Sequence, residues 1–116
     1  MPKAPTTEDR LRAVARGDLK CLGALSVIAT DGKAPGLDDE TYQLVQIAAL
    51  AAIDAPLASW LLRLEAVDDA EIPLEKILDT LIAVGPVVGT AKVVSASEKI
   101  VRVSALGAEF GVPAEG

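Results

Sequence analysis

The stretch PLEKILDTLIAV, residues Pro73 to Val84, decides the fold class. Its apolar residues follow the i, i+3, i+4, i+7, i+8 spacing of one helix face, and its polar residues occupy the other face. The apolar positions are Leu74, Ile77, Leu78, Leu81 and Ile82, and the polar ones are Glu75, Lys76 and Asp79. Pro73 suits the start of such a helix and Gly85 its end, after which Pro86 can begin another. The segment therefore predicts an amphipathic helix.

Two further helices are predicted upstream of this stretch. The first begins at residues 37–40, where acidic side chains favour a helix N-terminus, and carries apolar residues on nearly every side up to Ile53. Such an element is typical of a central helix covered by several neighbours. Asp54 is expected to cap the second helix, in which leucines recur at helical spacing beside Trp60. Residues 67–71 are expected to form a polar connection.

The two ends of the chain complete the predicted organisation. Thr7 is expected to cap a helix that ends at Gly17, and Asp18 to cap another, followed by a loop over residues 30–36. The valine-rich residues 86–106 suit strands by propensity, but their spacing also suits a helix and no hairpin turn interrupts them, so a helix is preferred. We predict an all-α fold, a compact bundle of about five to six helices. One domain is expected over residues 7–108, with tails at 1–6 and 109–116.

Composition excludes several common chemistries. The 116 residues contain no histidine, which excludes a Ser-His-Asp triad, a Cys-His pair and a histidine-ligated metal. Cys21 is the only cysteine, so disulfides within the chain and CxxC redox pairs are excluded as well. We expect Cys21 to be a small buried hydrophobic residue. The alternative, a redox protein acting through Cys21, predicts rapid labelling by a thiol reagent.

The charge balance disfavours two classes of partner. Seventeen acidic residues against eleven basic ones give a net charge of -6, which repels nucleic-acid phosphates and anionic membrane surfaces. No segment has the roughly 20 apolar residues of a membrane helix, and the N-terminus lacks the apolar core of a signal peptide. We therefore expect a cytoplasmic protein that binds neither nucleic acid nor membranes.

The sequence contains no motif for a cofactor or a metal ion. Neither GxGxxG nor GxxxxGK[ST] occurs, so nucleotide binding through these loops has no support. The carboxylate clusters at residues 38–40 and 68–71 lack EF-hand spacing and lie at predicted helix ends, where acidic residues are ordinary. We expect no cofactor and no metal site.

Side chains around residue 60 are the candidates for a ligand site. Trp60 and Arg63 are three residues apart, so Arg63 can stack on the indole or present its guanidinium to an anionic ligand. Glu65 lies on the opposite side of an ideal helix from Trp60, which disfavours a single pocket lined by both side chains. The alternative is a tryptophan at the solvent edge among surface charges.

The stretch from Leu37 to Ile100 has an acidic start, an alanine-rich helix, a short helix, a polar turn, an amphipathic helix with Glu75 and a final helix of small residues, and it includes the runs APLASWLL and VGPVVGTAKVVSA. In this order of elements it resembles the carboxymuconolactone decarboxylase family, which includes AhpD-like alkylhydroperoxidases, and it looks like a histidine-poor branch of that family. The resemblance implies an all-helical fold and a homo-oligomer, commonly a trimer or hexamer in that family. Peroxidase members carry CxxC and a histidine on the short helix, where this chain has DAPLASW at residues 54–60. The resemblance therefore implies no thiol peroxidase activity and transfers no catalytic residue.

The expected function is that of a carboxymuconolactone decarboxylase-like protein without peroxidase chemistry. Its activity is either lost or is a decarboxylase-like or lyase-like reaction on a small organic acid. In an active site, Arg63 would anchor the anion, Trp60 would form a hydrophobic wall and Ser59 would be a weak donor. Glu40 and Glu65 are the acid–base candidates, whose pKa values burial would have to raise. The alternative is a non-catalytic oligomeric scaffold or small-molecule binding protein, favoured by the missing catalytic residues and the large aliphatic fraction.

Overall fold

The computed structural model describes residues 4, 6–18 and 36–109, with side chains up to residue 104 in the last range. The chain divides into two compact units, Met1–Asp38 and Asp39–Gly116, which are described separately below. The domain predicted over residues 7–108 spans both. The helix predicted from Asp18 and the environment of Cys21 fall outside the described residues.

The first unit contains helix α1, Thr7–Ala15. Its N-cap is Thr6 and not Thr7, because a capping box forms one residue earlier than the sequence indicated. The Thr6 hydroxyl accepts a hydrogen bond from the Asp9 backbone N–H, and the Asp9 carboxylate accepts one from the Thr6 N–H. These two bonds satisfy backbone donors that the first turn leaves without helical partners.

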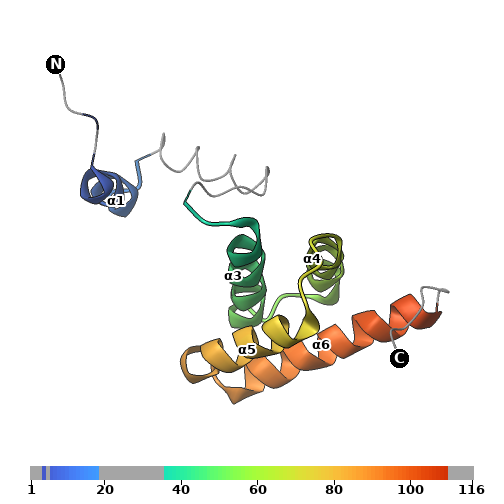
Figure 1. Cartoon of the computed structure of the whole chain (residues 1–116). Coiled ribbons are helices and arrows are strands. Elements are labelled where there is room, and N and C mark those ends of the chain that lie inside the picture. The colour runs from blue at the N-terminus through green and yellow to red at the C-terminus, as the bar shows by residue number, and fades with distance from the viewer. Residues whose placement is uncertain (1–3, 5, 19–35, 110–116) are drawn as a thin grey trace. The chain divides into compact units, whose positions relative to one another are not determined.

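The second unit is built from four helices, α3 (Asp39–Ala52), α4 (Leu57–Asp69), α5 (Leu74–Val88) and α6 (Thr90–Glu109). Figure 1 shows α3 and α4 on one side of this unit and α5 and α6 running side by side on the other. Helix α3 contacts the other three, as α6 also does, so α3 has the several neighbours that the sequence predicted. Residues 4, 6–18 and 36–109 include five helices and no strand, so the all-α prediction is confirmed and residues 90–109 are helical.

A core of aliphatic side chains around one tryptophan holds these four helices together. Trp60 of α4 and Ile47 of α3 are completely buried. The other buried members of the core come from all four helices and their connections, and they are Ala51, Ala55, Val67, Ile72, Ile77, Leu81, Ala96 and Ile100. Packing of this kind, and not helix propensity, supplies most of the stability of helices of this length.

The ends of α4 and α5 differ from the boundaries that the sequence indicated. Helix α4 continues to Asp69, and Glu71 makes the turn with a φ of 57°. Helix α5 does not end at Gly85 but continues through Pro86 to Val88. Pro86 has no N–H, so it removes one helical hydrogen bond, and it lies in the last turn, where only two residues of the helix follow it. Gly89, with φ 93° and ψ 152°, then reverses the chain into α6 in a backbone region that is essentially restricted to glycine.

Asp54 does not cap α4, contrary to the prediction. The N-cap of α4 is Pro56, which offers no side-chain hydrogen bond. Asp54 has a φ of 51°, and its Oδ1 atom accepts hydrogen bonds from Ser95 Oγ at 2.6 Å and Lys99 Nζ at 2.9 Å. These bonds, the Ser95 hydroxyl first and the Lys99 ammonium second, lower the pKa of the Asp54 carboxyl.

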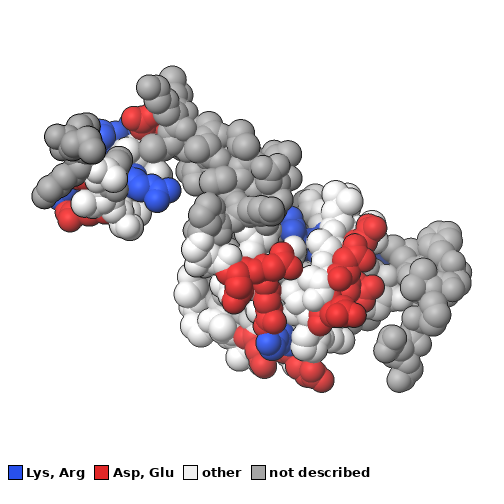
Figure 2. Space-filling view, turned by 45° about the horizontal axis from the view of Figure 1, so that its top comes forward, with Lys and Arg blue, Asp and Glu red and all other residues white. Residues whose placement is uncertain are grey.

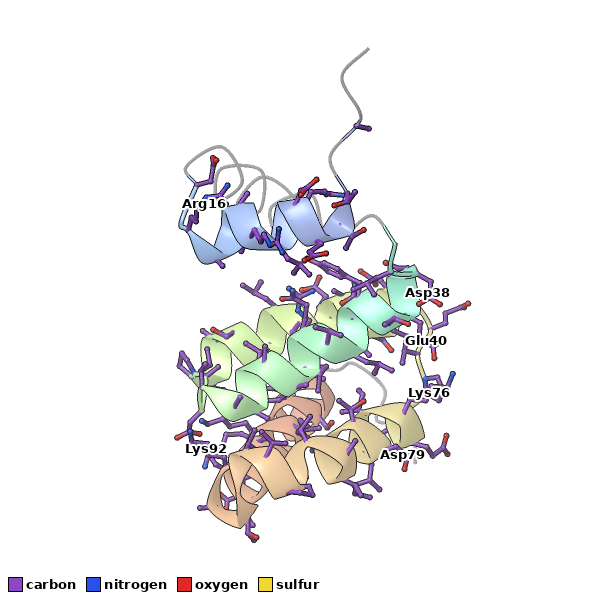
Figure 3. The ribbon with its side chains drawn as sticks, turned by 90° about the vertical axis from the view of Figure 1, so that its left-hand side faces the viewer. Arg16, Asp38, Glu40, Lys76, Asp79 and Lys92 are labelled. Carbon is purple, nitrogen blue, oxygen red and sulfur yellow. The ribbon has the colours of Figure 1, made fainter. Side chains whose placement is uncertain are left out.

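Two lysines of α6 also bind the end of α3 and the turn that follows it. Lys92 Nζ donates to the carbonyl oxygen of Ala52, and Lys99 Nζ donates to that of Ala55, both at 2.8 Å. Figure 3 shows Lys92 at the end of the unit where α3 stops. Cations are favourable here because the last carbonyl groups of a helix carry a partial negative charge. The polar side chains of α6 therefore anchor it to the α3–α4 turn.

We expect Asp54→Asn to lower the free energy of unfolding at pH 7, since the neutral amide loses the pairing with Lys99. Asparagine tolerates the positive φ, so backbone strain does not obscure the result. Because the folded-state pKa is lowered, the contribution of the carboxylate is complete above the ordinary value of 3.8 and is lost as pH falls through the folded value. Urea denaturation of the wild-type and Asp54→Asn proteins should show a smaller difference in the free energy of unfolding at about pH 3 than at pH 7. The same difference in the free energy of unfolding at both pH values would contradict this role of the Asp54 carboxylate.

Candidate functional site

Trp60, the predicted hydrophobic wall, is a core residue. Its side chain has no exposed surface and packs in the same cluster as Ile47 and Ala51 of α3. Among the described residues, the indole Nε1 has no hydrogen-bond partner. An unpaired buried donor costs free energy, so the packing of the ring system must outweigh it. The alternative of a tryptophan at the solvent edge is not what the structure shows.

Arg63, the predicted anion anchor, joins α4 to α3. Its Nη1 donates a hydrogen bond of 3.0 Å to Oε1 of Gln43, which is the buried polar residue of α3. Sequence reasoning did not single out Gln43, although its spacing from Ile47 and Ala51 places all three on one helix face. The structure thus brings Arg63 together with a neutral amide, which supplies an acceptor for a partly buried guanidinium.

The two predicted acid–base residues lie in different surroundings. Glu40, in the first turn of α3, forms an ion pair with Lys76 of α5, and Figure 3 shows these two side chains close together. Glu65 is exposed on α4, and Ser59 is half-buried on the same helix. Neither carboxylate has the burial that an acid–base role was expected to require. Their catalytic roles stay predictions, as does that of Ser59.

An apolar groove of the second unit lies elsewhere, between α5 and α6. This groove has a volume of about 200 Å³. Its lining consists of Leu74, Ile77, Leu78, Leu81, Ser97, Ile100 and Val101. The buried members Ile77, Leu81 and Ile100 form its floor, whereas Leu74, Leu78 and Val101 are exposed at its edges. None of the five predicted site residues lines the groove.

On the visible face of the second unit, Figure 2 shows acidic side chains gathered in clusters with few basic neighbours, among residues that carry neither charge. Even so, within residues 4, 6–18 and 36–109 no group of three or more His, Cys, Asp or Glu side chains is arranged to hold a metal ion. None of the described helices is long and apolar enough to cross a membrane.

The comparisons with known proteins give no family. No protein-family model, no curated protein and no solved structure matches the chain. The resemblance to the carboxymuconolactone decarboxylase family, carried by segments of residues 37–100, therefore stays a prediction.

We expect Trp60→Ala to lower the free energy of unfolding by about 3–5 kcal/mol, because it leaves a large cavity in the core. Trp60→Phe should cost less, since it removes the unpaired N–H and keeps an aromatic ring. Leu62→Ala, at an exposed position of the same helix, is the matched control and should change stability little. Urea denaturation measures all three. If Trp60→Ala lowers the free energy of unfolding no more than Leu62→Ala does, the core role of Trp60 is contradicted.

Proposed function

We propose that this chain is a non-catalytic, homo-oligomeric scaffold subunit, built to associate with copies of itself. The observation that carries this proposal is the apolar groove between α5 and α6, whose edges expose large aliphatic side chains. Among the lining residues Leu74 is 66% exposed, Leu78 54% and Val101 68%, and Ile82, which follows on the same helix, is 62% exposed. Contiguous aliphatic side chains of this size on a surface are favourable to bury and mark interaction sites.

The chemistry of the groove favours a protein partner over a small organic acid. Its volume of about 200 Å³ is below the roughly 300 Å³ at which ligand pockets begin. Ser97 is its one polar lining residue, and no cationic side chain lines it to neutralise a carboxylate. A site for a small acid would need several polar groups to fix the orientation of the ligand.

Three of the five candidate side chains from the sequence also have structural partners that favour a scaffold. Trp60 fills the core, Arg63 binds Gln43 and Glu40 pairs with Lys76. Each of these contacts joins α3 to another helix or packs against it. A decarboxylase-like or lyase-like activity on a small organic acid is the competing function, and it predicts saturable binding of such an acid to the wild-type chain.

Light scattering of the full chain at micromolar concentration tests the proposal. We expect a mass that is a multiple of 12.0 kDa, and the family resemblance predicts three or six subunits. A constant mass of 12.0 kDa across the concentration range would overturn the scaffold proposal, because the exposed aliphatic surface would then have no second copy to cover it.

A further inference from the structure

We propose that the polar cluster formed by Asp54, Lys92, Ser95 and Lys99 selects the rotation of helix α6 about its own axis. The helix carries two apolar stripes that differ by one residue in position, and both have the pattern of a core face. The cluster favours the observed packing over one in which α6 is turned by about 100°, the angle between successive residues of a helix. This inference concerns packing within the subunit, so it holds whether or not the groove binds a second copy.

The two stripes of α6 resemble each other closely. The core stripe, which includes the buried Ala96 and Ile100, consists of Val93, Ala96, Ile100 and Val103. The second stripe follows it by one residue at each position and consists of Val94, Ser97, Val101 and Ser104. Its two valines are exposed, at 51% for Val94 and 68% for Val101. Both stripes have the spacing of three and four residues that one helix face requires, so apolar periodicity alone specifies the rotation of α6 weakly.

The serines of the second stripe do not exclude it from the core. Ser97 Oγ donates a hydrogen bond of 2.9 Å to the carbonyl oxygen of Val93, and Ser104 Oγ donates one of 3.2 Å to that of Ile100. Because each hydroxyl donates to the preceding turn of its own helix, it keeps this partner when the whole helix rotates. A buried hydroxyl that has a partner costs far less free energy than one without. The second stripe is therefore a competing core face.

The polar side chains of the cluster lie on a third face of α6, and their contacts distinguish the two rotations. On a helical wheel Lys92, Ser95 and Lys99 lie about 90° from the core stripe, on the side away from the second stripe. They donate four hydrogen bonds to the end of α3 and the turn after it, to two backbone carbonyl oxygens and to Oδ1 of Asp54. Turning the second stripe into the core would bring the aliphatic core stripe to these oxygens instead. All four hydrogen bonds would then be lost.

The turn after α3 does not itself require the carboxylate of Asp54. The Ala55 N–H donates to the carbonyl oxygen of Leu50 and the Asp54 N–H to that of Ala51, which are the two hydrogen bonds of a Schellman motif. Glycine is the usual residue at the position of Asp54, where φ is 51°, and a negative charge is unfavourable at a helix C-terminus. Local preference therefore does not explain this side chain, whereas its contact with α6 does. Single polar residues fix the register of apolar helix interfaces in coiled coils in the same way.

Asp54→Gly combined with Ser104→Val in the full chain tests the selection. Glycine keeps the turn and deletes the carboxylate, and valine at position 104 makes the second stripe nearly as apolar as the first. The readout is the nuclear Overhauser effect to the Gly85 α-protons, because Val93 Cγ2 lies 3.7 Å from the place of a Cβ atom at Gly85 and the rotated helix puts Val94 there. We expect Ser104→Val alone to show the Val93 contact. The double variant should show the Val94 contact as well, with the rotated population raised about tenfold by the loss of two charge-assisted hydrogen bonds.

Glu71→Gly in the same Ser104→Val background is the matched control. Glu71 occupies the equivalent position after α4, with a φ of 57° and the same pair of backbone hydrogen bonds, so this variant should show the Val93 contact alone. The proposal is overturned if the Asp54 variant also shows the Val93 contact alone, because the apolar stripes then select the rotation unaided. A Val94 contact of equal strength in the control overturns it as well. Loss of helicity by circular dichroism in the Asp54 variant would also overturn it, since the cluster would then hold the fold together and not select between two packings.

Discussion

The width of the apolar surface on α5 is the constraint on which the rest of the second unit depends. If Ile77 and Leu81 were the only apolar residues on this side of α5, packing against α3 and α6 would bury all of its apolar surface. Leu74, Leu78 and Ile82 extend this surface past the reach of those neighbours. Because aliphatic area left in water lowers the stability gained on folding, the subunit is more favourable when another surface covers it. The self-association that we propose would use the same apolar periodicity that forms the core.

The helical class could be read from the sequence because spacing is a local property. The apolar positions of residues 74–82 and the acidic start of α3 both correspond to helices in the structure. The end of α5 could not be read in this way, since Gly85 and Pro86 are helix breakers that the last turn tolerates. Asp54 looked like a cap, but Ser95 and Lys99, about forty residues later, use its carboxylate instead. Long-range contacts of this kind override local signals.

Long-range contacts also decide where the candidate site residues lie. The sequence placed Trp60 and Arg63 on one helix, but it did not show that the indole would be the centre of the core or that Gln43 would accept the guanidinium hydrogen bond. The sequence did not predict the groove between α5 and α6. The spacing of apolar residues shows how wide the apolar face of a helix is, but it does not show which part of that face the neighbouring helices cover. The absence of histidine excluded several catalytic classes, and in the structure two of the polar candidates have partners within the fold, Arg63 with Gln43 and Glu40 with Lys76.

The most direct measurement is the solvent accessibility of individual methyl groups in the associated protein. NMR with a soluble paramagnetic probe reports this for leucine and valine side chains one at a time. We predict that the methyl groups of Leu78 and Val101, which are exposed in the single chain, are shielded from the probe, while those of Leu62 stay accessible. An equal response of the Leu78 and Leu62 methyl groups to the probe in the associated protein would contradict association through the α5–α6 groove.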